Sequence, residues 1–109
     1  MIRIETVGDL PSLRQVRILS DFFEAEGLEM SLPDSPQFLL VIKCRHGILG
    51  CRLVDHEVAD KLNIAAAIFS AARLEDILAG TPQSLTSAAI AKGAQLSMTG
   101  EEIIALFSE

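Results

Sequence analysis

Four side chains that can bind a metal or supply a nucleophile lie close together in the chain: Cys44, His46, Cys51 and His56. Two thiolates and two imidazoles could hold a zinc ion, and a thiolate beside a base could attack a substrate. The C-x6-C spacing lacks the paired C-x2-C turns of structural zinc sites. We therefore expect no metal and no cofactor, and we keep these four residues as the alternative metal set.

The two cysteines flank a hairpin that we predict over Gln37–Val54, with its turn at His46-Gly47. Gly47 supplies the positive φ that such a turn needs. A two-residue loop there would pair Cys44 with Leu49 and place Cys51 on the same, apolar face of the sheet. We interpret both cysteines as core residues, since a free cysteine behaves as a small buried hydrophobe.

A second chemical pattern, His56-Glu57-Val58-Ala59-Asp60, resembles the metalloprotease sequence H-E-x-x-H. Asp60 stands where that motif has its second imidazole, and the helix available to it is short. The preceding Asp55 is explained as the N-cap of this helix, and Glu57 suits the positive end of the helix dipole. We interpret the segment as a solvated helix start.

The composition narrows the classes of function. The chain has 109 residues, which we treat as one domain over 1–109, and half of them are hydrophobic, with neither Trp nor Tyr. A net charge of −6 without a basic cluster argues against nucleic acid. No apolar run reaches the ~20 residues that span a membrane, and the N-terminal residues lack the basic and apolar pattern expected of a signal peptide. We expect a cytoplasmic protein that self-associates as a dimer or tetramer, and the sequence leaves any small-molecule ligand unknown.

The elements that would position these residues follow from periodicity and capping signals. Strands are predicted over Met1–Val7, Leu28–Leu32, Ile64–Ala71 and Ala94–Ser97, besides the hairpin. Helices are predicted over Ser12–Glu26, His56–Leu62, Arg73–Ala79, from Thr81 to Gly93, and after the capping box Thr99–Glu102. The fold class is α+β, or mixed α/β, with a central sheet of about five strands packed by four to five short helices.

The run Gly47-Ile48-Leu49-Gly50-Cys51, followed by Asp55, resembles the YunC-like family of small bacterial and archaeal proteins of unknown function. The similarity extends from about Leu28 to the end and includes the segments 74–78, 81–85 and 98–102. Residues 34–109 would then be the family-like core, and residues 1–33 a variable N-terminal region. The resemblance implies an oligomer, because the N-terminal region of the family is described as mediating tetramer formation, and it implies no established activity.

Two departures from the family pattern bear on function. Ser70-Ala71-Ala72 stands where the family has Gly-Val followed by a basic residue, so that the charge is displaced to Arg73. Arg52 replaces the glycine that follows the family cysteine. We expect a non-catalytic binding or scaffold domain. The alternative is a small enzyme or thiol-dependent ligand binder centred on Cys51, with Asp55 and Arg73 as the other candidate catalytic residues.

Overall fold

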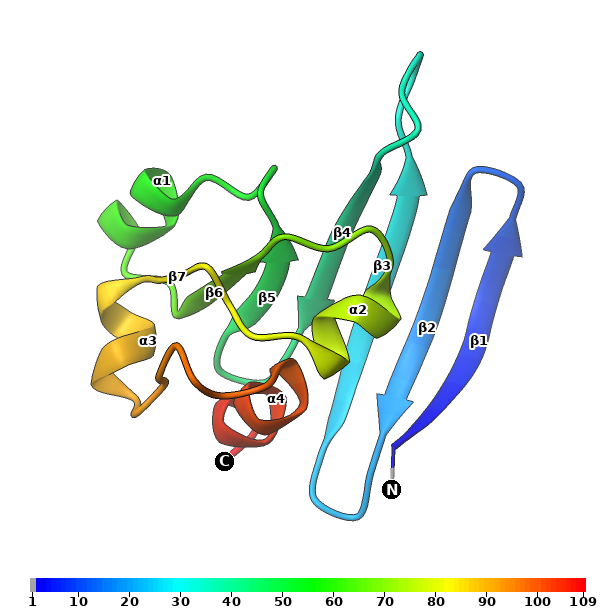
Figure 1. Ribbon diagram of the computed structural model, residues 1–109. Coiled ribbons are helices and arrows are strands. Elements are labelled where there is room, and N and C mark those ends of the chain that lie inside the picture. The colour runs from blue at the N-terminus through cyan, green and yellow to red at the C-terminus, as the bar shows by residue number, and fades with distance from the viewer. Residues whose placement is uncertain (1) are drawn as a thin grey trace.

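The computed structural model describes residues 2–109 and has an α+β fold. It contains one mixed sheet, with parallel and antiparallel pairs, whose seven strands lie side by side in chain order (Figure 1). The strands are β1 (Arg3–Leu10), β2 (Leu13–Leu19), β3 (Glu24–Ser31), β4 (Phe38–Lys43), β5 (Ile48–Cys51), β6 (Ala66–Phe69) and β7 (Ser84–Leu85). The helices are α1 (His56–Lys61), α2 (Leu74–Ala79), α3 (Ser87–Ala91) and α4 (Gly100–Phe107). The α+β class is confirmed, and the sheet is larger than the expected five strands.

The N-terminal third is an antiparallel meander, and the helix predicted over Ser12–Glu26 is wrong. Strand β2 buries Val16 and Ile18 at two-residue spacing, with 1% and 0% of their surface exposed. Its other face carries half-buried leucines at positions 13 and 19. Apolar residues on both faces produce an accidental three-residue spacing, which imitates a helix. The first strand also runs on to Leu10, past the expected break at Gly8.

The hairpin predicted over Gln37–Val54 is confirmed as β4 and β5, with a corrected register. The backbone N–H of Cys44 donates to the carbonyl of Gly47 at 2.8 Å, so the turn centres on Arg45-His46. Leu49 therefore pairs with Ile42 and not with Cys44. Moving the loop by one residue shifts the pairing by two, and a shift of two keeps every side chain on its face. Both cysteines are accordingly buried, as predicted.

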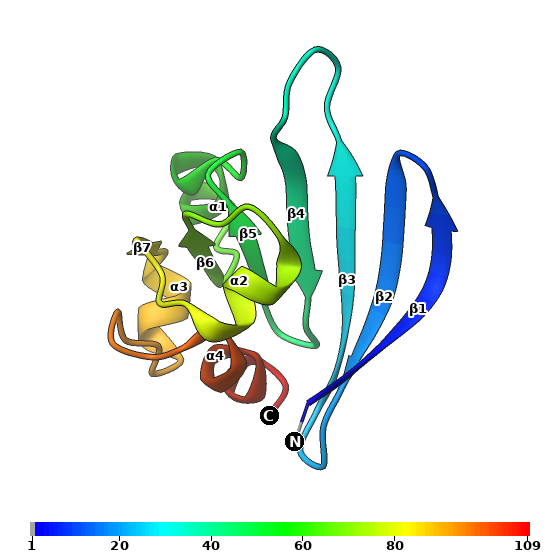
Figure 2. The same cartoon turned by 45° about the vertical axis from the view of Figure 1, so that its right-hand side comes forward.

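Strands β5 and β6 are parallel and are joined through α1. Alternate residues of β6 face opposite layers: Ala66 and Ile68 pack with Ala59 of α1, whereas Ala67 and Phe69 belong to the main core. Helices α2 and α4 pack together on the main-core side of the sheet (Figure 2). Helix α1 thus covers one face of the sheet at β6, and α2 to α4 lie on the other face.

The helix ends follow the predicted caps with two corrections. Asp55 accepts from the N–H of Val58 at 3.2 Å, and Thr99 with Glu102 forms the predicted capping box of α4. The predicted start at Thr81 is wrong, because residues 84–85 pair with β6 and the helix begins after Thr86. The strand predicted over Ala94–Ser97 is also wrong, since no strand is formed there and Leu96 and Ser97 lie in a turn. No helix in residues 2–109 is long and apolar enough to cross a membrane.

Candidate functional site

A pocket of about 450 Å³ opens where the parallel strands β5 and β6 end. After Cys51 the chain turns toward α1 on one face of the sheet, whereas after Phe69 it turns toward α2 on the other face. Two neighbouring parallel strands whose connections leave to opposite faces create a crevice outside their carboxyl ends, and such crevices bind ligands in open α/β sheets. We call this space the β5–β6 pocket.

Three segments supply its walls. The β5 end and the loop after it contribute one wall, the β6 end and its loop contribute the second, and the β3–β4 connection closes the third side. The lining residues are Leu32, Ser35, Gln37, Phe38, Cys51, Arg52, Leu53, Phe69, Ser70 and Ala71. The lining combines an apolar floor with neutral hydrogen-bonding groups and one guanidinium group. This balance is typical of small-molecule sites, whose volumes run from about 300 to 1,000 Å³.

Cys51 and Arg73, two of the three candidate catalytic residues, lie on either side of Phe38. The Cys51 thiol lies 3.9 Å from the Phe38 carbonyl oxygen, to which it can donate a weak hydrogen bond. The Arg73 guanidinium carbon lies 4.8 Å from the centroid of the Phe38 ring, a cation–π distance. Cys51 is 5% exposed and lines the pocket, whereas Arg73 does not line it and contacts Phe38, which does.

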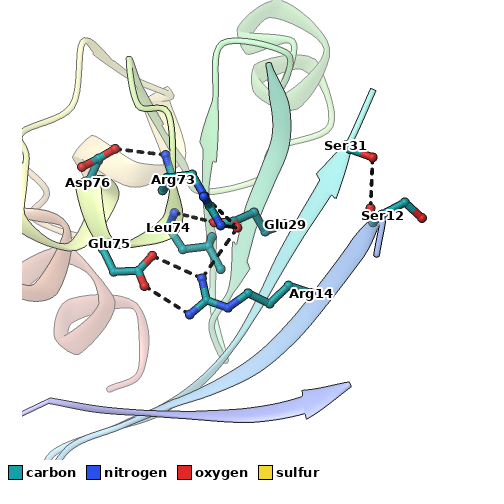
Figure 3. Close-up of polar contacts among 8 residues, drawn as sticks. All are labelled: Ser12, Arg14, Glu29, Ser31, Arg73, Leu74, Glu75 and Asp76. Carbon is teal, nitrogen blue, oxygen red and sulfur yellow. Dashed lines mark hydrogen bonds and ion pairs between the residues drawn. The ribbon is translucent and has the colours of Figure 1, made fainter. Parts of the chain in front are cut away.

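A buried carboxylate holds Arg73 in that position (Figure 3). Glu29 of β3 is 2% exposed and accepts hydrogen bonds from Arg73 Nε at 2.9 Å and from the backbone N–H of Leu74 at 3.0 Å. Arg14 of β2 lies 3.6 Å from the same carboxylate. Glu29 therefore binds the first turn of α2 to the middle of the sheet, next to the pocket wall.

The charges around Glu29 decide its ionisation. Desolvation by burial pushes its pKa upward, but the hydrogen bonds from Arg73 and Leu74 and the charges of Arg73 and Arg14 outweigh that effect, so the pKa lies below its ordinary value. Arg14 also pairs with Glu75 of α2 through both terminal guanidinium nitrogens, at 3.3 and 3.1 Å (Figure 3). This hydrogen bond lowers the pKa of Glu75, against a smaller effect of desolvation. Both carboxylates are thus stabilised as anions.

The third candidate catalytic residue, Asp55, does not face the thiol across the pocket. Its carboxylate caps α1, and it lines a neighbouring pocket of about 530 Å³ together with His56, Ser84 and Gln83. In this pocket His56 Nδ1 lies 3.2 Å from Ser84 Oγ. Asp60 stands one helical turn from His56, but it accepts hydrogen bonds from the N–H and hydroxyl of Ser87, and these lower its pKa. Asp60 is therefore held by Ser87 and is not free to orient the His56–Ser84 pair.

The alternative metal set is spread over the hairpin. Cys44 and His46 lie in or next to the β4–β5 turn, whereas Cys51 ends β5 at its far end, and His56 begins the helix beyond. Within residues 2–109, no three His, Cys, Asp or Glu side chains are placed to hold a metal ion together. Burial also raises the pKa of the Cys44 thiol to about 12, which keeps it protonated at neutral pH.

Sequence reasoning missed Glu29 and the pocket itself. The sequence did contain a signal for the burial of Glu29. Ala25, Gly27 and Glu29 alternate on one face of β3, and the small side chains at the first two positions leave room for a helix to pack there. A Cβ on Gly27 would lie 2.8 Å from Val16 Cγ2 and 3.0 Å from Leu74 Cδ1. The pocket had no local signal, since its three walls are separated in the sequence and meet only in the fold.

Comparison with known proteins supports the fold alone. No family model matches the chain, and no curated protein matches it. A solved structure with a similar fold is that of TA1206, a protein of unknown function from Thermoplasma acidophilum. The match has a TM-score of 0.71 and 17% sequence identity, and it covers 99% of this chain and 94% of that chain. The likeness therefore shows that the two chains share a fold.

Proposed function

We propose that the chain is a small, non-catalytic binding domain whose ligand occupies the β5–β6 pocket. The observation that carries this proposal is the position of the pocket at the carboxyl ends of two parallel strands whose connections diverge. Its lining, within residues 2–109, includes no carboxylate and no imidazole that could serve as a base for Cys51. A thiol without a base favours binding over thiol catalysis.

The test is to fill the pocket and measure binding of a small aromatic probe. Ala71 lines the pocket, whereas its neighbour Ala72 does not line it and is exposed. In a titration with phenylacetamide followed by amide NMR, we expect shifts at Cys51, Phe69 and Ser70. Ala71→Phe should abolish these shifts, and the matched control Ala72→Phe should retain them. Equal loss in both variants, or no shifts in the unmodified protein, would contradict the proposal.

The enzyme alternative centred on Cys51 predicts a different result. If the thiol performs chemistry, Cys51→Ala should abolish turnover of a reactive ester while the fold is retained. We expect no such turnover in the unmodified protein. A thiol-dependent activity that survives Ala72→Phe and disappears with Cys51→Ala would replace the binding proposal with an enzymatic one.

We further propose that the protein self-associates through the face of β1–β4 that points away from α2. Paired residues of neighbouring strands share a face, and Leu10, Leu13, Met30 and Leu39 form one apolar row across the four strands. Leu13, Met30 and Leu39 are half-buried, whereas Leu10 is 63% exposed. A contiguous apolar row of this kind typically marks an interface. We call this surface the open face.

The charges on the open face favour a second copy of the chain as the partner. Four residues along β2, β3 and β4 from the apolar row lies a charged row, which alternates in sign across the strands: Glu5, Arg17, Glu26 and Lys43. An alternating row is complementary to itself when two copies meet about a two-fold axis. In sedimentation analysis, Met30→Lys should convert the oligomer to a monomer. Leu96→Lys, at a leucine that is 56% exposed elsewhere, should leave it intact. A monomer before any substitution would contradict self-association.

Membership of the YunC-like family and a cytoplasmic location remain parts of this proposal. The two cysteines are free thiols, which suits a reducing compartment. The oligomer mass of the chain tests self-association. The same pocket titration on TA1206 would show whether the fold similarity extends to the site.

A further inference from the structure

We propose that the ligand of the β5–β6 pocket is a small organic anion with an apolar body, such as an aromatic or branched carboxylate, and that Arg52 binds its charged group. This inference rests on the proposed binding function and specifies its ligand class. It follows from the charges of the lining, from the shape of the turn that carries Arg52, and from the apolar side chains opposite it.

Arg52 is the one cation among the residues that line the pocket, and no carboxylate lines it. Four other arginines of the chain, Arg3, Arg14, Arg17 and Arg73, are held in ion pairs. In residues 2–109, Arg52 has no carboxylate oxygen within 4.0 Å. In a chain with a net charge of −6, a pocket with an unneutralised guanidinium group selects for anions.

The backbone around Arg52 is built to present this side chain. The N–H of Val54 donates to the carbonyl of Cys51 at 3.0 Å, which closes a tight turn with Arg52 and Leu53 at its tip. This turn folds back over Gly50, where a Cβ would lie 2.4 Å from Val54 Cγ2. Only glycine at position 50 admits the turn. The β5 sequence therefore fixes the backbone of Arg52 at the edge of the pocket that its side chain lines.

The rest of the lining matches an apolar body carrying a few polar atoms. Phe38 and Phe69 contribute aromatic surface, and Leu32, Leu53 and Ala71 contribute aliphatic surface. Ser35, Gln37 and Ser70 offer neutral donors and acceptors without charge. A ligand that is apolar at one end and anionic at the other satisfies both parts of the lining at once.

The Cys51 thiol is a native reporter of this selectivity. Iodoacetamide and iodoacetate both alkylate a thiolate: the sulfur attacks the methylene carbon, the S–C bond forms and iodide leaves with the electron pair of the C–I bond. The two reagents differ in charge but hardly in size. Peptide mass spectrometry assigns each product to Cys51 or Cys44, so no cysteine needs to be removed. Rates are divided by those of N-acetylcysteine to cancel intrinsic reactivity.

We expect the iodoacetate-to-iodoacetamide rate ratio at Cys51 to exceed that of N-acetylcysteine and to fall about three- to tenfold in Arg52→Gln. This is the size expected for one unit charge roughly 5 Å away at a dielectric close to that of bulk water, because the Arg52 side chain is exposed to solvent. Any change in the ionisation of Cys51 affects both reagents equally and cancels in the ratio. The control Arg45→Gln, at the other end of the hairpin, should leave the ratio unchanged. Added salt should reduce the ratio in the unmodified protein and not in Arg52→Gln.

The outcomes separate the two proposals. If Cys51 reacts with iodoacetamide in the native state and the ratio does not respond to Arg52→Gln, the anion inference is overturned while the binding pocket stands. If Cys51 reacts with neither reagent until the protein unfolds, the pocket is closed and the proposed function fails with it. A ratio that falls equally in Arg52→Gln and Arg45→Gln would show a general surface potential and would also overturn the role of Arg52.

Discussion

Replacing the buried carboxylate in Glu29→Gln should destabilise the fold by about 2–3 kcal/mol. The carboxylate accepts hydrogen bonds from Arg73 and from the N–H of Leu74, and a hydrogen bond to a charged group is worth about 1.5–3 kcal/mol. The glutamine oxygen can still accept from one of these donors, but its NH₂ group faces guanidinium donors. Water can reach Arg73, whose side chain is 51% exposed, and this holds the loss below that of a fully buried pair.

Urea denaturation followed by far-UV circular dichroism measures this loss. With an m-value of about 1–3 kcal/mol/M, the midpoint should fall by roughly 1–2 M without a change in m. Glu24→Gln is the matched control, because Glu24 lies on the same strand and pairs with an exposed arginine, Arg17, at the surface. The control should show no measurable loss. A loss below about 0.5 kcal/mol in Glu29→Gln would refute the view that this carboxylate joins α2 to the sheet.

The same residue sets an acid limit to stability. Its pKa is lowered in the folded state, so on acidification the unfolded chain takes up the proton first, near the ordinary value of 4.5. The unfolded state then binds more protons than the native state, and stability falls as the pH drops through the folded pKa. The stabilisation is fully present above about pH 4.5. Glu29→Gln should lack this part of the acid-induced loss, and an unchanged pH profile would contradict the assignment.

Three further predictions concern packing, capping and thiol reactivity. Gly100→Ala should destabilise the protein by about 3 kcal/mol or more in urea denaturation, because a Cβ there would lie 1.9 Å from the Ile77 carbonyl oxygen. The control Gly8→Ala should cost much less, because a Cβ there would approach no atom closer than 3.9 Å, on Gln15. The buried hydroxyl of Thr86 donates to the Ile64 carbonyl at 2.7 Å and accepts from the Ala66 N–H at 2.9 Å. Thr86→Val should therefore lower the free energy of unfolding by about 2–3 kcal/mol, and Thr86→Ser, which keeps the hydroxyl, by much less. With Ellman's reagent at pH 8, Cys44 should remain unreactive in the native protein because burial raises its pKa to about 12, and rapid labelling of Cys44 would show that the hairpin end opens.

The elements of the C-terminal two-thirds were largely predictable because their signals are local. The Asp55 cap, the Thr99–Glu102 capping box and the buried strand around Ala66–Phe69 each depend on residues a few positions apart. The N-terminal third was mispredicted because β2 is apolar on both of its faces. Phe22 contributed to the false helix pattern, although it lies in the β2–β3 turn and is 86% exposed.

By itself the sequence determined the α+β class, the central hairpin and the burial of both cysteines, because side-chain alternation survives an error of two residues in register. Only the tertiary structure decided the site. Cys51, Phe38 and Arg73 meet because parallel β5 and β6 send their connections to opposite faces and because Glu29, 44 residues before Arg73, binds its guanidinium group. A contact between distant segments depends on how strands associate, and no local periodicity encodes that association.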